Sequence, residues 1–112
     1  MLNRIIQLFK GPQGKAPMTI APENITAEVE IYTTMFCGFC WKAKGLLESK
    51  GVPFKEYDVS SDAGLRKVMK DRSNGGRTVP QIFIDGKHVG GCDELHALER
   101  QGSLNPMLEG AA

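Results

Sequence analysis

Residues 29–40 read VEIYTTMFCGFC, and this stretch decides the fold. In residues 29–33, β-branched side chains alternate with a glutamate and a tyrosine, which predicts a short β-strand. Apolar side chains at helical spacing follow over residues 40–50, and Gly51 ends that helix. The two cysteines of the stretch therefore lie where a strand passes into a helix.

The rest of the chain continues this alternation of strands and helices. Further strands are expected at 52–59, 81–84 and 87–90, and further helices at 63–71 and 92–101. The Asp-Gly pair between the last two strands is a strong hairpin signal. The order is thus β-α-β-α-β-β-α, with a parallel and an antiparallel half. It predicts the thioredoxin-like α/β fold, a four-stranded mixed sheet flanked by helices.

Composition limits the class of protein. The chain has 112 residues, enough for one domain, and a formal net charge of +1. No run approaches the roughly 20 apolar residues of a membrane-spanning helix. We therefore expect neither a membrane nor a nucleic-acid partner. Three cysteines, two of them in one Cys-x-x-Cys pair, favour a reducing compartment, the cytoplasm, over a secreted disulfide scaffold.

Residues 1–27 are expected to form a flexible N-terminal extension, and residues 28–112 the domain. Residues 11–22 contain three prolines and two glycines, a composition typical of a linker. The apolar residues of segment 2–9 could instead line one face of a docking helix. No acidic residue precedes Glu23, which also fits an organellar transit peptide. An organellar location is therefore the alternative to the cytoplasm.

Cys37 and Cys40 form the Cys-x-x-Cys pair at the expected helix N-terminus. Cysteine reacts as its thiolate, and the unpaired N–H groups of a helix N-terminus stabilise an anion. Cys40 follows about one turn later, so it can attack a disulfide formed at Cys37. The spacing predicts redox chemistry with Cys37 as nucleophile and Cys40 as resolving cysteine.

Two other interpretations of the pair stay open. Together with Cys92 and either His88 or His96, the pair could complete a structural zinc site of the Cys₃His type. The pair could also be a purely structural disulfide. Its position inside a β-α-β pattern, with no second Cys-x-x-Cys in the sequence, favours redox chemistry.

Two further motifs could form the walls of a binding site. Residues 78–80, Thr-Val-Pro, precede a strand, where a cis proline would expose the preceding backbone to a ligand. Residues 90–93, Gly-Gly-Cys-Asp, end the hairpin and open a helix, whose free N–H groups can receive a carboxylate. Taken singly, the first motif could be only a proline at the start of a strand, and the second only a tight turn.

Together these motifs resemble those of the dithiol glutaredoxins, close to the bacterial glutaredoxin 3 type. The resemblance rests on CGFC at 37–40, TVPQIFI at 78–84 and GGCDEL at 90–95, and it covers about residues 28–108. It implies a glutathione groove, with Pro80 in cis and Val79 pairing with the tripeptide backbone. The residues implied to line the groove are Phe39, Thr78, Val79, Pro80, Cys92 and Asp93.

The resemblance also suggests how the charged ends of glutathione are held. Cys92 and Asp93 would lie at the γ-glutamyl end, where the Asp93 carboxylate can pair with the α-amino group. Arg77 and Lys42 are candidates for the glycine carboxylate. Trp41 is expected to be partly packed rather than to stack on a substrate.

The sequence departs from the family at three positions. Many members have lysine at Thr34, and dithiol members have proline and tyrosine at Gly38 and Phe39. Monothiol members, which deliver [2Fe-2S] clusters, also begin with Cys-Gly-Phe, but they carry serine at the position of Cys40. A homodimer with a glutathione-ligated [2Fe-2S] cluster, held by Cys37 and acting as cluster carrier or redox sensor, is therefore the alternative function.

We expect a glutathione-dependent thiol-disulfide oxidoreductase that reduces protein-glutathione mixed disulfides and protein disulfides. Its partners would be glutathione, as co-substrate, and oxidised or glutathionylated proteins. Apart from a possible cluster, no metal is expected, and the chain is expected to be a monomer unless a cluster bridges two copies.

Overall fold

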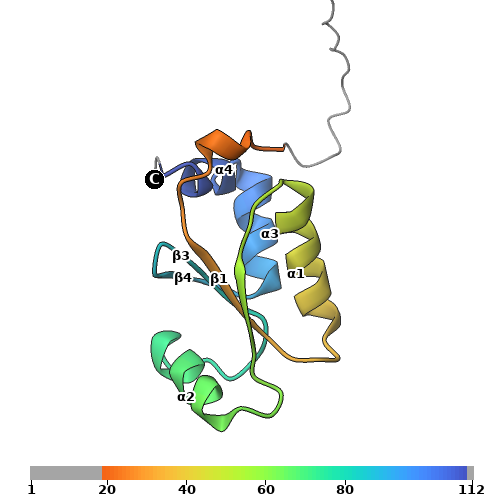
Figure 1. Ribbon diagram of the computed structural model, residues 1–112, viewed down its shortest axis with the longest axis vertical. Helices are drawn as coiled ribbons and strands as arrows, with labels where there is room; N and C mark the ends of the chain where they lie inside the picture. The colour runs from red at the N-terminus through yellow and green to blue at the C-terminus, as the bar shows by residue number, and fades with distance from the viewer. Residues whose placement is uncertain (1–18, 111–112) are drawn as a thin grey trace, which may run out of the picture.

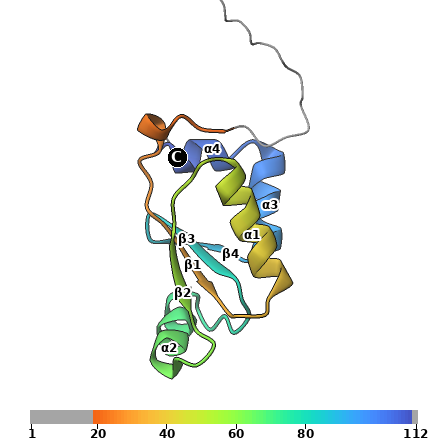
Figure 2. The same ribbon diagram turned by 45° about the vertical axis from the view of Figure 1, so that its right-hand side comes forward.

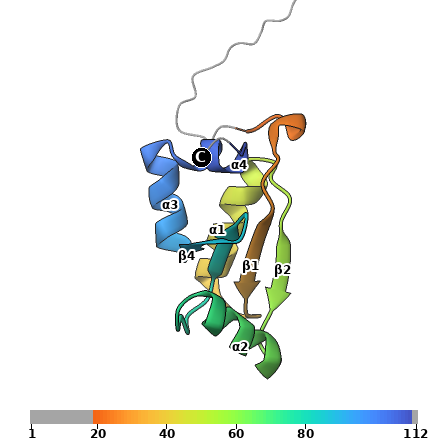
Figure 3. The same cartoon turned by 90° about the vertical axis from the view of Figure 1, so that its left-hand side faces the viewer.

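The computed structural model describes residues 19–110 (Figure 1). Their strands form one sheet in the order β2-β1-β3-β4. β1 runs parallel to β2, as Figure 3 shows, and antiparallel to β3, which pairs antiparallel with β4. The strands are β1 (Val29–Thr33), β2 (Lys55–Asp58), β3 (Gln81–Ile84) and β4 (Lys87–Gly90). The predicted four-stranded mixed sheet is confirmed.

Helices cover both faces of this sheet. α1 and α3 lie side by side on one face, while α2 packs against the other (Figures 1 and 2). A short 3₁₀ helix, η2 (Pro22–Asn24), precedes β1. The helices are α1 (Gly38–Ser49), α2 (Ala63–Arg72), α3 (Cys92–Gln101) and α4 (Leu104–Leu108). None of the helices within 19–110 is long and apolar enough to cross a membrane.

Alternation along the strands divides the core into two layers. Isoleucine and valine side chains of β1 and β3 enter the larger layer beneath α1 and α3, with Ile31 and Ile82 fully buried. Tyr32 and Phe83 point to the opposite face, where they contact Met69 of α2. This larger layer anchors α1, the helix that begins at the cysteine pair.

The hairpin between β3 and β4 forms as its Asp-Gly pair predicts. Asp85 and Gly86 have φ values of 52° and 79°, the left-handed pair that a tight two-residue turn requires. Asp85 also bonds the start of β1, because its N–H donates to the Glu28 carbonyl and its carboxylate accepts the Glu28 N–H. The turn therefore fixes the hairpin against β1.

Residues 19–27 pack against the domain, although the sequence places them in the extension. Ile20 is buried, and its N–H donates to the carbonyl of Lys50. The N–H groups of Thr26 and Ala27 both donate to the Leu108 carbonyl of α4, an element that the sequence pattern did not predict. The remainder of the predicted extension, residues 1–18, lies outside the described residues, so that part stays a prediction.

Lys50 joins the ends of three helices. Its side chain is fully buried, and Nζ lies 2.8 Å from Glu99 Oε1 and 2.6 Å from Asn105 Oδ1. Burying an ammonium group is costly unless it is paired in this way. The C-terminal end of α1 is thereby fixed to α3 and α4.

A polar cluster fixes α2 to the sheet. The Arg72 guanidinium donates to Glu30 at 2.9 Å and to the Tyr32 hydroxyl at 2.8 Å, and it lies 4.1 Å from the centre of the Phe83 ring. Tyr57 donates a further bond to Glu30. The bond from Arg72 outweighs the opposing effect of burial and holds the pKa of Glu30 below its ordinary value of 4.5.

Replacing Glu30 by Gln should lower the free energy of unfolding at pH 7 by about 2 kcal/mol, because hydrogen bonds to a charged group are lost. Since the folded pKa of Glu30 lies below the unfolded value, this stabilisation is complete above pH 4.5 and is lost as pH falls through the folded pKa. Urea unfolding at a series of pH values measures the difference. A difference that stays constant down to pH 2 would contradict the assigned ion pair.

Candidate active site

The cysteine pair lies at the N-terminus of α1. Cys37 is the N-cap residue in extended conformation, and its Sγ accepts a hydrogen bond of 3.1 Å from the backbone N–H of Cys40. The two cysteines form a disulfide. Cys37 is half-buried, whereas Cys40 is fully buried. The outer sulfur is therefore the accessible one, as the predicted roles of nucleophile and resolving cysteine require.

Strand register brings the two other motifs to the same place. Tyr32 of β1 pairs with Gln81 of β3, so Pro80 lies beside the end of β1, next to the cysteine pair. Ile82 of β3 pairs with Gly90 of β4, which places the start of α3 alongside. The sheet thus assembles three separated segments around one sulfur.

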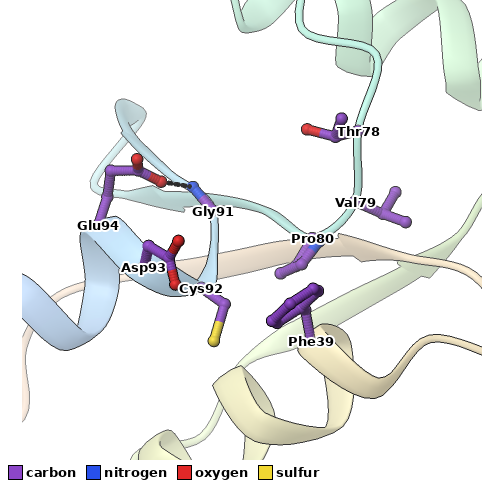
Figure 4. A pocket seen from close by; sticks show the side chains of 8 residues that line it. All are labelled: Phe39, Thr78, Val79, Pro80, Gly91, Cys92, Asp93 and Glu94. Atoms are coloured by element: carbon purple, nitrogen blue, oxygen red, sulfur yellow. Dashed lines mark hydrogen bonds between the residues drawn. The ribbon is translucent and has the colours of Figure 1, made fainter.

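These segments enclose a groove with a volume of about 300 Å³. In Figure 4 the Phe39 ring lies against Pro80, while Cys92 and Asp93 project from the start of α3. The Val79-Pro80 bond is cis, and the Val79 carbonyl oxygen lies 3.8 Å from Cys37 Sγ. All six residues that the family resemblance assigns to a glutathione groove line this one: Phe39, Thr78, Val79, Pro80, Cys92 and Asp93.

Gly91, a member of the 90–93 motif, and Glu94, to which the sequence analysis assigned no role, also line the groove. Glu94 Oε1 accepts the Gly91 N–H at 2.7 Å, the dashed line in Figure 4. A Cβ at Gly91 would lie 3.3 Å from the Pro80 carbonyl oxygen, a tight contact that favours glycine there. The three-residue spacing from Gly91 to a glutamate is the sequence signal of an N-terminal helix cap, and it could have identified Glu94.

Cys92 forms part of the groove wall as a neutral thiol. It is 5% exposed, and burial raises the pKa of its thiol. Its Sγ lies 3.5 Å from His96 Nδ1, within the same helix. Cys92 is therefore shielded where Cys37 is accessible.

The wall formed by residues 78–80 is supported from behind by a buried side chain. Gln81, 6% exposed, donates from Nε2 to the carbonyl oxygen of Thr78 at 3.1 Å. The amide oxygen of Gln81 lies 2.6 Å from Nε2 of His88 on β4. These bonds fix the backbone that faces the groove.

A family model described as Glutaredoxin matches residues 29–89. The chain belongs to the glutaredoxin family. It is 53% identical over 83 residues to glutaredoxin 3 of Escherichia coli, covering 74% of this chain and 99% of that protein.

Solved structures agree with this assignment. The glutaredoxin of Brucella melitensis has a TM-score of 0.67 and 42% identity, over 88% of this chain and 98% of that one. The buckwheat glutaredoxin-glutathione complex has a TM-score of 0.69 and 28% identity, over 79% and 82%. With its cysteine pair, this glutaredoxin is a thiol-disulfide oxidoreductase of the thioredoxin-like fold.

The sequence suggests two cationic residues, Lys42 and Arg77, as candidates to hold the glycine carboxylate of glutathione. Neither Lys42 nor Arg77 is among the residues that line the groove. Arg77 instead borders a separate hollow with Arg66 and Lys70. In this glutaredoxin Thr34 supplies no charge, and Lys44 is paired with Glu56 at 2.9 Å.

The zinc interpretation finds no support among the described residues. Within 19–110, no three His, Cys, Asp or Glu side chains gather where they could hold a metal ion. The two histidines instead contact Gln81 and Cys92, as described above.

The expectation for Trp41 was wrong. This side chain is 72% exposed, and it lines a second hollow on Cys37 together with Met35 and Phe36. An aromatic residue at the edge of a helix is usually partly packed, but within residues 19–110 the Trp41 side chain is largely exposed in the first turn of α1.

Replacing Glu94 by Ala should lower the free energy of unfolding by about 1 kcal/mol, because the Gly91 N–H loses its acceptor at the N-terminus of α3. Glu94→Gln is the matched control, since its amide oxygen can accept the same bond. Urea unfolding compares the three proteins. Equal stability of the Ala variant and the wild type would show that this cap contributes nothing.

Proposed function

We propose that this glutaredoxin reduces protein-glutathione mixed disulfides, with glutathione as the electron donor. The observation that carries the proposal is the groove that runs from Phe39, between the two cysteines, to the N-terminus of α3 and includes Val79, whose carbonyl oxygen lies 3.8 Å from Cys37 Sγ. Its volume of about 300 Å³ suits a small peptide. The relative from buckwheat, which was solved as a glutathione complex, supports the same ligand.

In the proposed complex, glutathione lies extended across the groove with its sulfur at Cys37. Its backbone pairs with the main chain of Val79, which the cis bond to Pro80 presents toward the groove. Its γ-glutamyl end lies at α3, where the first N–H groups of the helix can receive the α-carboxylate. The Asp93 carboxylate pairs with the α-amino group, and Phe39 and Cys92 supply the apolar wall.

The reaction proceeds by two exchanges at the same sulfur. The Cys37 thiolate attacks the glutathione sulfur of the mixed disulfide, so a bond forms to Cys37 while the protein sulfur leaves and takes up a proton. A second glutathione thiolate then attacks the glutathione sulfur on Cys37. Glutathione disulfide leaves, and the Cys37 thiolate is regenerated at the helix N-terminus.

Protein disulfides require the second cysteine. Cys37 attacks the protein disulfide and forms a mixed disulfide with the protein, and Cys40 then attacks Cys37 Sγ to release the reduced protein. The product is the Cys37–Cys40 disulfide present in this structure. Glutathione reduces it again in two further exchanges.

Replacing Cys37 by Ser should abolish reduction of a glutathionylated protein, because the attacking sulfur is lost. Replacing Cys40 by Ser should retain most of this activity but abolish reduction of a protein disulfide, which needs the resolving cysteine. Release of glutathione, coupled to its reductase, measures the first reaction. Equal losses in both variants on the mixed disulfide would contradict the assigned roles.

A second candidate function, a carrier of a [2Fe-2S] cluster, is favoured by one observation at Gly38. A Cβ built there meets no atom within 4 Å, so the position next to Cys37 is not filled by neighbouring side chains. Cys37, half-buried beside the Val79 wall of the groove, fits a ligand role, with one cysteine and one glutathione from each of two chains. Bound in this way, the cluster would supply iron and sulfide for transfer or a one-electron redox signal.

Anaerobic reconstitution with iron, sulfide and glutathione tests this second candidate. It predicts a coloured dimer with charge-transfer absorption, and a colourless monomer from Cys37→Ser. Gly38→Pro, which restores the residue of other dithiol members, should reduce cluster yield while leaving disulfide reduction intact. A colourless wild-type monomer would contradict the carrier role without affecting the reductase.

A further inference from the structure

A second hollow lies against Cys37, outside the glutathione groove. It has a volume of about 310 Å³ and is lined by Met35, Phe36, Cys37, Gly38 and Trp41. We call it the apolar subsite. None of its lining residues is charged, and its three large side chains are exposed: Phe36 by 95%, Trp41 by 72% and Met35 by 61%. A cluster of large apolar side chains this exposed marks an interaction site more often than chance.

The backbone beneath the apolar subsite is held in place. The Met35 N–H donates to Ser60 Oγ at 2.8 Å, and the Ser60 N–H donates in turn to Asp58 Oδ1 at 2.8 Å. On the other side, the Trp41 N–H donates to the Cys37 carbonyl at 3.1 Å in the first turn of α1. The loop after β1 is thus tied to the end of β2, so the backbone that carries Met35 and Trp41 is held in place.

The chemistry of the reaction requires space on two sides of Cys37. Glutathione has one residue on each side of its cysteine, and in the proposed complex it occupies the groove that Phe39 and Asp93 line. A protein substrate continues beyond its reactive cysteine in both directions. At about 3.3 Å per residue in an extended chain, a side chain one or two positions away reaches a neighbouring hollow.

We propose that the apolar subsite binds an aliphatic or aromatic side chain located one or two residues from the reactive cysteine of the protein substrate. This inference rests on the proposed function and adds a preference among its protein substrates. In the reduction of a mixed disulfide, this contact acts in the transition state, while the protein sulfur is leaving the glutathione sulfur. In the reduction of a protein disulfide it also acts while the protein is bonded to Cys37, before Cys40 releases it.

A second copy of this chain is the competing occupant, and size argues against it. A stable interface takes about 20–30 residues on each side, whereas five residues line the apolar subsite. A small apolar contact suits a substrate that must leave after each turnover. An extended peptide segment therefore fits better than a dimer partner.

Two glutathionylated peptides test the proposal, identical except for Phe or Ser two residues from the cysteine. The mixed disulfide of cysteine and glutathione, which has no flanking residue, is the reference substrate. The test variant is Phe36→Ser combined with Trp41→Ser. Val68→Ser on α2 is the matched control, because it removes an apolar side chain that is also exposed, by 44%, but lies outside the subsite.

For the wild type and Val68→Ser, kcat/KM should be about tenfold higher for the Phe peptide than for the Ser peptide. In the double variant this preference should disappear, while kcat/KM for the reference disulfide stays within about twofold of wild type. Circular dichroism checks that the double variant is folded. Each single variant should lose part of the preference, which keeps the test valid if the double variant does not fold.

Equal kcat/KM values for both peptides in the wild type, or a preference that survives in the double variant, would overturn the apolar subsite and leave the proposed function intact. A wild type that fails on the reference disulfide would overturn the proposed function itself, and with it the subsite. A concentration-dependent dimer that the double variant loses would assign the hollow to a second copy instead.

Discussion

The bond of 3.1 Å from the Cys40 N–H to Cys37 Sγ joins the reactive sulfur to the first turn of α1. It places an acceptor where a helix has unpaired donors and partial positive charge, the setting that stabilises a thiolate. The reactivity of the site depends on this position of Cys37 Sγ at the N-terminus of α1. Thr34 carries no charge and Lys44 is paired with Glu56, so neither adds a free positive charge beside the helix N-terminus at Cys37. Burial of Cys40 beneath it leaves Cys37 as the sulfur that a substrate can reach.

The sheet supplies the geometry around that sulfur. Because β3 is antiparallel to both of its neighbours, its first residue meets the end of β1 and the end of β4 together. The cis Val79-Pro80 bond and the turn into α3 are brought to Cys37 by pairing alone, and Gln81 fixes the wall from behind. On the far face, the Glu30–Arg72 pair holds α2, which leads into the loop before Thr78. The strands that position the groove are therefore the same strands that hold α2 and stabilise the fold.

Much of this architecture follows from sequence pattern. β1, β3, β4 and α3 have the bounds expected, since alternation, an Asp-Gly turn and flanking glycines fix them locally. Six groove residues were also anticipated, through a resemblance of motifs rather than from periodicity. The five-residue α4 was missed because it is too short for a periodic pattern and depends on the burial of Leu104 and Leu108. β2 is shorter than expected, at Lys55–Asp58, because the apolar residues on either side are buried outside the ladder. The exposure of Trp41 depends on which side of α1 faces the sheet, a tertiary feature that its position next to Cys40 does not settle.

One hollow is lined by Cys37 itself, and the other is the groove lined by Val79, whose carbonyl oxygen lies 3.8 Å from Cys37 Sγ. We assign glutathione to the groove, which Cys92 and Asp93 also line. Trapping isotope-labelled glutathione as a mixed disulfide on Cys37 of the Cys40→Ser protein, and recording nuclear Overhauser effects between the two, tests this directly. The account predicts contacts from the glutathione to Phe39, Val79 and Cys92. Contacts confined to Met35, Phe36 and Trp41 would contradict it.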